Sequence, residues 1–127
     1  MAAAVTLTEK AHKGIKKITW AWTAHTDGKV ATTTTNAATT FTYTGELMRL
    51  VTVPGAGDDA PDDNYTVLVR DDDSVDVLMA AATANRDTAN TEQVAASSLG
   101  VVGYSKLTLY VEGAGSGNKG TVHLYIR

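Results

Sequence analysis

The chain has 127 residues, of which 43% are hydrophobic and 20% are charged, so it is long enough for one domain and too apolar for an intrinsically disordered chain. Its net charge of −3 gives no reason to expect a nucleic-acid partner, and the absence of cysteine excludes disulfides and zinc–thiolate sites. Because no apolar run has the length of a signal peptide or a membrane span, we expect a cytosolic product without a membrane partner.

Threonine is abundant, with 20 residues, and its β-branched side chain favours strands over helices. In chain order, Trp20 and Trp22 alternate with small or polar residues in a strand that is predicted to begin near Ile15. Asp27-Gly28 then predicts a tight turn into a Thr-rich strand at residues 29–35. The first expected element is therefore a hairpin with both indoles on one face.

The middle of the chain is predicted to alternate strands with polar loops. Strands are expected at residues 39–44, 47–53, 65–69 and 75–79. Gly45 is expected to end the first of these, and residues 55–64 form an exposed loop. The aspartate-rich turn at residues 71–74 should pair the strand before it with the strand after it.

The last third is predicted to hold a loop and a hairpin. Residues 80–99 are expected to be loop, with a short helix near 91–97 as the alternative. Alternating apolar residues predict strands at 106–112 and 121–127, joined as a hairpin by the glycine-rich run 113–120. About seven to nine short strands with frequent turns predict an all-β, single-domain β-sandwich over residues 1–127, jelly-roll-like, with residues 1–10 as a short extended arm.

Acidic crowding is the strongest chemical pattern, since eight of the 14 carboxylates lie between residues 58 and 76. Calcium favours such oxygen clusters, but the ligand spacing of an EF-hand loop is missing. We therefore predict turn-forming aspartates, no metal site and no cofactor. Replacing Asp71, Asp72 and Asp73 by Asn should leave the response to calcium unchanged.

No pattern of catalytic residues stands out. No Gly-x-Ser-x-Gly elbow accompanies His12, His25 or His123, and the run 113–120 lacks the residue order of a phosphate-binding loop. A glycosidase would need its paired acids in a cleft, whereas these acids lie in turns. We therefore predict that the protein is not an enzyme.

Trp20 and Trp22 leave two interpretations open. If exposed, they would form a platform for stacking sugar rings, and the protein would be a carbohydrate-binding module. If packed beside Ile18 they belong to the core, which is the more frequent place for such a pair.

The order of several short motifs is similar to that of a known protein family. These motifs are Ile-Lys-Lys-Ile-Thr-Trp at 15–20, Val-Pro-Gly at 53–55, Asn-Tyr-Thr-Val-Leu-Val-Arg-Asp at 64–71, Asp-Ser-Val-Asp-Val-Leu at 73–78, and Asn85-Arg86. From Ile15 onward the chain resembles small virion-associated proteins of tailed bacteriophages. The motifs are structural rather than chemical, and the resemblance implies a turn glycine where this chain has Ser74.

The resemblance implies a virion structural protein, in the first place a jelly-roll decoration, or cement, protein that stabilises the outer capsid. A head–tail connector or tail component is the alternative. Its partners would be the major capsid protein and sister copies, in a dimer or trimer on the capsid surface, after synthesis in the host cytoplasm. We expect the arm to dock by strand addition through Val5, Leu7 and Lys10, and its deletion to leave the fold nearly as stable.

Overall fold

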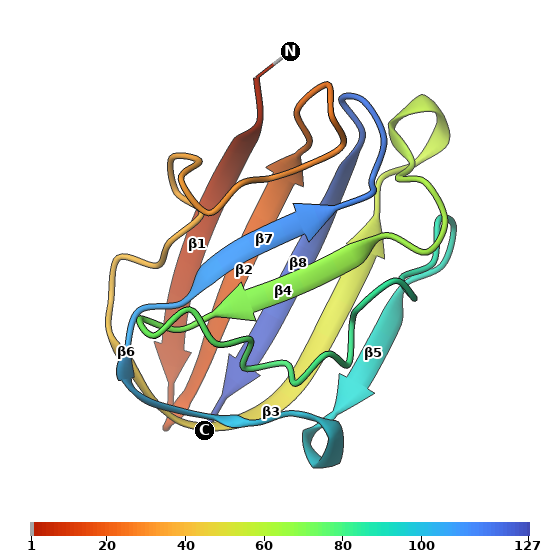
Figure 1. Cartoon of the computed structure of the whole chain (residues 1–127). Coiled ribbons are helices and arrows are strands. Elements are labelled where there is room, and N and C mark those ends of the chain that lie inside the picture. The colour runs from red at the N-terminus through yellow and green to blue at the C-terminus, as the bar shows by residue number, and fades with distance from the viewer. Residues whose placement is uncertain (1) are drawn as a thin grey trace.

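Eight strands and two short 3-10 helices make up the regular structure of residues 2–127, which a computed structural model describes (Figure 1). The strands are β1 Ala4–His12, β2 Ile15–Thr23, β3 Tyr43–Pro54, β4 Thr66–Arg70, β5 Glu92–Ala95, β6 Val101–Ser105, β7 Thr108–Glu112 and β8 Lys119–Ile126. The helices are η1 Gly57–Asp59 and η2 Ala96–Ser98. The prediction of an all-β, single-domain sandwich is confirmed.

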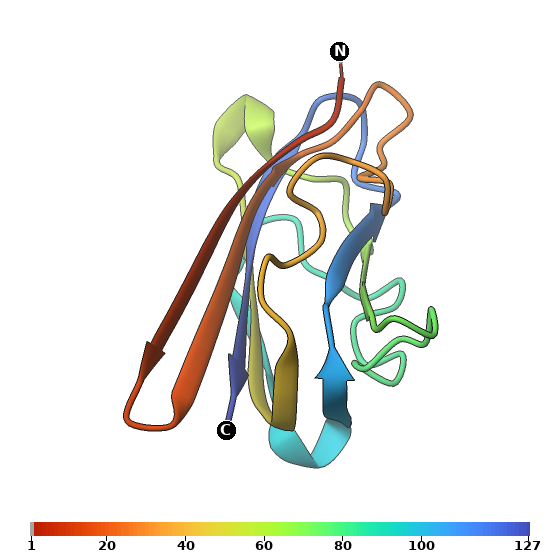
Figure 2. The same ribbon diagram turned by 90° about the vertical axis from the view of Figure 1, so that its left-hand side faces the viewer.

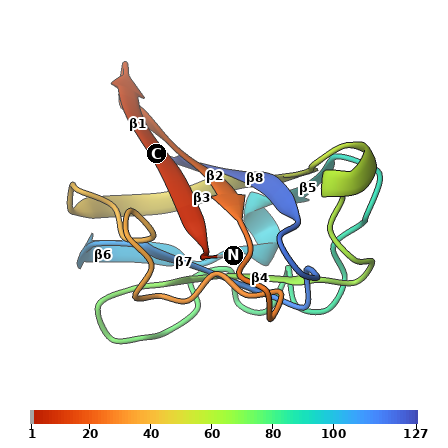
Figure 3. The same cartoon turned by 90° about the horizontal axis from the view of Figure 1, so that it is seen from above.

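The strands form two antiparallel sheets of unequal size. The large sheet has the order β1-β2-β8-β3-β5, and β6 pairs with the first part of β3. The small sheet contains β4 and β7. Seen from the side and from above, the small sheet lies over one face of the large sheet, while the β1–β2 hairpin extends away from the sandwich (Figures 2 and 3).

The core between the sheets is built by strict alternation of inward apolar and outward polar side chains. On β2, Trp20 is fully buried and Trp22 is 2% exposed, and the Trp22 ring lies against Tyr65 with a centroid distance of 5.7 Å. Strands β2, β4, β7 and β8 supply further inward residues that have no exposed surface, namely Ile18, Val67, Val69, Leu109, Val111, Val122, Leu124 and Ile126. Alternation with period two is therefore what places the core.

The N-terminal segment differs from the expected arm. Ala4–His12 is strand β1, and it pairs with β2 along all nine of its residues, from Ala4 opposite Thr23 to His12 opposite Ile15. Val5 packs in the core with 6% exposure. The segment is ordered by its own chain because its apolar residues cover the indole face of β2.

The predicted strands at 106–112 and 121–127 correspond to β7 and β8, but their pairing as a hairpin is wrong. β7 pairs with β4 in the small sheet, whereas β8 lies between β2 and β3 in the large one. The glycine-rich connection crosses from one sheet to the other. Its length allows this crossing, which a tight turn would not.

The hairpin predicted after Trp22 is also wrong. The turn exists, with Gly28 at φ +80° and the Asp27 carboxylate accepting the Lys29 N–H at 3.0 Å. Residues 29–35, however, form no strand, and their backbone pairs with the small sheet through the bridge of Val30 with Val111. The turn sends the chain across the sandwich because both edges of β2 are already paired.

Three smaller differences concern the middle of the chain. The β3 strand runs from Tyr43 through Gly45 with a register shift, so Gly45 does not end a strand. Residues 75–79 form turns with a single bridge, Arg70 with Asp76, and not a strand. Within the expected loop at 80–99 the structure has β5 and the short helix η2.

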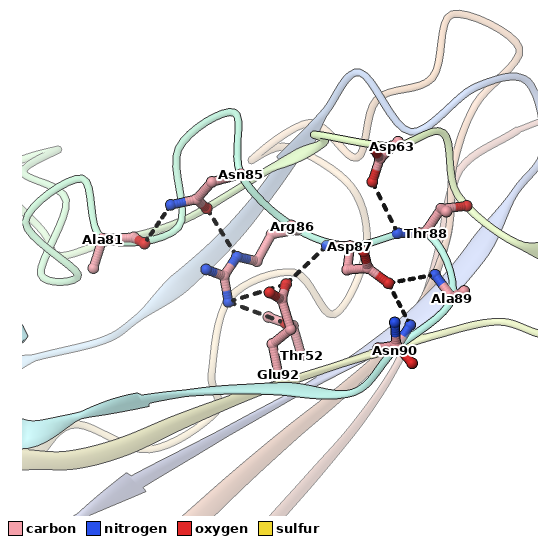
Figure 4. A network of polar contacts seen from close by, with 10 residues as sticks. All are labelled: Thr52, Asp63, Ala81, Asn85, Arg86, Asp87, Thr88, Ala89, Asn90 and Glu92. Atoms are coloured by element: carbon pink, nitrogen blue, oxygen red, sulfur yellow. Dashed lines mark hydrogen bonds and ion pairs between the residues drawn. The ribbon is translucent and has the colours of Figure 1, made fainter.

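Arg86 fastens the segment after β4 onto the large sheet (Figure 4). Its guanidinium donates to the Thr52 hydroxyl at 3.3 Å and lies 3.7 Å from a carboxylate oxygen of Glu92, and its Nε donates to the Asn85 side chain. Arg86 is only 6% exposed. A buried cation persists only when it is paired and hydrogen-bonded, so this network serves the fold.

Candidate interaction surfaces

The outer edge of β1 is open. The Lys13-Gly14 turn has φ values of +49° and +82°, which is the geometry of a two-residue hairpin, and the residues flanking such a turn exchange backbone hydrogen bonds. The even-numbered residues of β1 therefore bond to β2. The Val5 carbonyl points the other way and accepts a hydrogen bond from the Asn36 amide at 3.3 Å.

It follows that Leu7, Glu9 and Ala11 direct their backbone N–H and C=O groups away from β2. Within residues 2–127, no strand pairs with this side of β1. A nine-residue edge with unpaired donors and acceptors is a template for another strand, and proteins normally shorten or block such edges.

An apolar groove of about 630 Å³ lies beside this edge, between the tip of the β1–β2 hairpin and the start of β3. Glu9, Ala11, Phe41, Tyr43 and Tyr104 line it. Phe41 is 61% exposed and Tyr104 is 85% exposed. Large aromatic side chains with this much exposure are the residue type that anchors protein–protein interfaces.

Glu9 holds one wall of the groove in place. Its carboxylate accepts the backbone N–H groups of Thr40 and Phe41 at 3.1 and 3.2 Å, and the Tyr43 hydroxyl donates to it at 2.8 Å. Burial raises the pKa of Tyr43, and the bond to the Glu9 carboxylate and its charge raise it further. The loop carrying Phe41 is thus fixed before any partner binds.

The other wall holds Tyr104 in an unusual backbone conformation. Its φ is +51°, a region that side chains larger than glycine rarely occupy, and its N–H donates to the Thr44 hydroxyl at 2.9 Å. Lys16 donates to the Thr44 carbonyl at 2.9 Å from the opposite side of the groove. Strained backbone of this kind gathers at binding sites, where it presets a side chain.

The outer face of the large sheet is cationic. The Tyr125 ring lies under two cations, with Lys17 Nζ at 5.4 Å and the Arg49 guanidinium at 5.1 Å from its centroid. Lys10 stands directly opposite Lys17 on the neighbouring strand, a like-charge pair that costs stability. Glu46, the acidic residue of β3, forms an ion pair with Arg127 at 2.9 Å.

His123 lies on this same face and makes the fold sensitive to acid. Its Nδ1 is 2.9 Å from the Thr19 hydroxyl, and its pKa is lowered by burial and by the positive charges of Lys17 and Arg49. The unfolded chain therefore binds a proton that the native ring resists, and stability falls as the pH drops through about 6.5.

Replacing His123 by Gln should remove the contribution of this ring to the pH dependence of stability. We expect the free energy of unfolding of the variant to fall less than that of the wild type between about pH 7.5 and pH 5.5, as measured by urea denaturation. His12 and His25 are present in both proteins and cancel in the comparison. Parallel pH profiles would show that His123 titrates alike in the native and unfolded states.

The acidic residues gather in the turns around the small sheet. Asp71 accepts the N–H groups of Asp73 and Val75, and Asp76 accepts those of Val69, Leu78 and Ala80. The prediction that aspartates form the turn at 71–74 is confirmed for Asp71, whereas Asp76, which was expected in a strand, also holds a turn. In the part of the chain described, no three acidic or histidine side chains are grouped as metal ligands. Ser74 has φ +63°, as expected for a position suited to glycine.

The side chains of the three predicted interface residues do not form one exposed surface. Val5 is buried, Leu7 is half-buried against the core, and only Lys10 is exposed. Trp20 and Trp22 are core residues, so the sugar-stacking platform is wrong and the packed interpretation is confirmed. The backbone of β1, rather than its apolar side chains, is available to a partner.

Sequence reasoning missed Phe41 and Tyr104. Phe41 lies in the alternating segment 39–44, which predicted a strand and not an exposed anchor, and Tyr104 stands 63 positions later in a segment without apolar alternation. They meet only because the start of β3 pairs with β6. No local signal in the sequence announces the groove.

No protein-family model, no curated protein and no solved structure matches the chain. The site is therefore interpreted from its geometry. None of the helices in residues 2–127 has the length and apolar character needed to cross a membrane.

Proposed function

We propose that this protein is a structural component of a tailed-bacteriophage virion, a decoration protein that binds the outside of the capsid and stabilises it. The observation that carries the proposal is the aromatic groove of Phe41 and Tyr104 beside the open edge of β1. The similarity of motif order to small virion-associated proteins supports the phage assignment. The partner is the major capsid protein.

The groove and the edge provide two modes of protein recognition on one side of the molecule. Aromatic side chains in an apolar depression supply binding energy, because they bury much surface at little cost in side-chain entropy. An open strand edge pairs with a strand of the capsid or of a sister copy through backbone hydrogen bonds and needs no special side chains. A protein with both features can attach firmly without a recognisable catalytic or ligand motif.

The charge distribution favours an acidic surface on the partner. Lys10, Lys17 and Arg49 concentrate positive charge on the outer face of the large sheet, although the whole chain carries −3. An acidic partner would relieve the repulsion of Lys10 and Lys17. Many such contacts, repeated by the symmetry of the particle, add up to stable attachment.

Removing the two aromatic rings tests the proposal. We expect the double variant Phe41→Ser, Tyr104→Ser to bind capsids that lack this protein on the order of tenfold or more weakly than the wild type. Co-sedimentation with capsids built from the major capsid protein of the same phage measures this. The matched control is Val75→Ser, which removes an exposed apolar side chain, 57% exposed, outside the groove.

Unchanged binding of the double variant, or equal losses in both variants, would contradict docking through the groove. A reconstruction of the particle by electron cryo-microscopy tests the position independently. Density for the sandwich on the outer capsid is expected. Density confined to the neck or tail would replace the decoration role by that of a connector or tail component.

A further inference from the structure

The β1 edge has the properties of a self-complementary surface. Leu7, Glu9 and Ala11 present unpaired backbone donors and acceptors on the open side, while the Val5 carbonyl is capped by Asn36. An antiparallel copy of the same strand offers the same groups in reverse order. Pairing of two copies about a twofold axis therefore satisfies the open edges of both copies at once. A strand from another protein would satisfy the edge of one copy only.

The register of such a pair follows from parity and length. Residues whose backbone groups point to the open edge must face each other, and in β1 these are the odd-numbered ones. A twofold axis at Thr8 places Leu7 opposite Glu9 of the second copy and aligns all nine residues, Ala4 opposite His12 at each end. In this register the Val5 carbonyl faces Ala11 of the second copy and keeps its bond to Asn36, so the new backbone bonds are centred on Leu7 and Glu9. An axis at Leu7 or at Glu9 aligns seven residues, and the axis at Glu9 also brings two carboxylates face to face.

The positions of the charged residues are compatible with the axis at Thr8. Lys10 faces Thr6 of the second copy and Glu9 faces Leu7, so no like charges stand directly opposite each other across the axis. The two large sheets join through β1 into one continuous sheet, in which each copy contributes its six strands. The cationic faces then lie side by side on one surface.

We infer that two copies of the chain form a dimer by antiparallel pairing of their β1 strands, with Thr8 on the twofold axis. The inference deepens the proposed function, on which it rests, by naming the sister contact and the twofold-symmetric cationic face that the dimer would offer to a capsid. The dimer is a property of the purified protein and is testable without any particle.

A single cysteine tests the register, because the natural chain has none. Thr8 would form a non-hydrogen-bonded pair with its twofold mate, with Cα atoms about 4.5 Å apart, within the range of a disulfide. Thr8→Cys is therefore expected to give a covalent dimer under mild oxidation. Thr6→Cys is the matched control on the same exposed face, since its mate lies four residues away, about 13 Å along the strand.

The wild type should have twice the chain mass of 13.3 kDa in light scattering. Leu7→Pro removes a donor at the open edge and should give a monomer, whereas Leu7→Ala, which loses the same side-chain contacts but keeps the N–H, should remain a dimer. If Leu7→Pro does not fold, the comparison of Thr8→Cys with Thr6→Cys still tests the dimer. A monomeric wild type, a trimer, or equal cross-linking of the two cysteine variants overturns the dimer. None of these results affects the capsid-binding test.

Discussion

Replacing Trp20 by Ala is expected to lower the free energy of unfolding by about 3–5 kcal/mol. Trp20 has no exposed surface and lies in the middle of β2, so its removal leaves a large cavity in the core of the large sheet. Its indole N–H also donates to the Ala37 carbonyl at 2.9 Å. The Ala37 carbonyl keeps the Leu109 N–H as a second donor at 2.9 Å, so the loss of the indole bond adds only about 1 kcal/mol to the cost of the cavity. Urea denaturation at neutral pH measures the change.

Trp22 provides the matched comparison. Among the residues described, its indole N–H is buried without a hydrogen-bond acceptor, whereas that of Trp20 is paired. Replacing each by Phe removes a similar volume, but only the Trp20 variant breaks a bond. We expect Trp20→Phe to cost about 1 kcal/mol more than Trp22→Phe. A larger cost for Trp22→Phe would mean that packing of its ring against Tyr65 and Gly120 outweighs the bond.

The strands that the sequence predicts well are those whose signal is local. Residues 18–22, 67–69, 107–111 and 122–126 alternate apolar and polar side chains, and each segment is a strand or contains most of one, with its apolar side in the core. Alternation depends only on neighbours along the chain. It therefore identifies the strand and its buried face without knowledge of the partner.

Strand pairing depends on distant residues and is not visible in this way. A turn signal such as Asp27-Gly28 says that the chain reverses, but not whether it returns to the same sheet. In this protein both edges of β2 are occupied, by β1 from the N-terminus and by β8 from the C-terminus. Both predicted hairpins consequently became crossings between the sheets.

The candidate site was the least predictable part for the same reason. One wall of the groove depends on the hydrogen bonds of the Glu9 carboxylate with Thr40 and Phe41, more than 30 residues away in the chain. The other wall depends on the left-handed backbone conformation of Tyr104. Neither has a signature in the local sequence. The aspartate turns, by contrast, are local hydrogen-bonding motifs and were recognisable from composition.

Deleting residues 2–8 is expected to leave most of the chain unfolded at room temperature. The truncation removes Val5 from the core and the half-buried Leu7, which face Trp22 and Trp20 on β2. Full burial of a side chain of this size contributes roughly 1.5–3 kcal/mol, and half-burial contributes less. The loss of the backbone hydrogen bonds to β2 lowers the stability further. The total of about 5 kcal/mol approaches the whole stability of a small domain.

Deleting only Ala2 and Ala3, which precede β1, is the matched control and should leave the denaturation midpoint nearly unchanged. Circular dichroism and urea denaturation of both truncated proteins measure the difference. If the longer deletion costs less than about 1 kcal/mol, β1 is a detachable arm and not a structural strand. The expected outcome instead makes β1 serve two roles, because its inward side chains complete the core while its outer backbone edge stays free for a second strand. Assembly at that edge then requires no ordering of a disordered tail, and the conformational entropy of β1 has already been lost in folding.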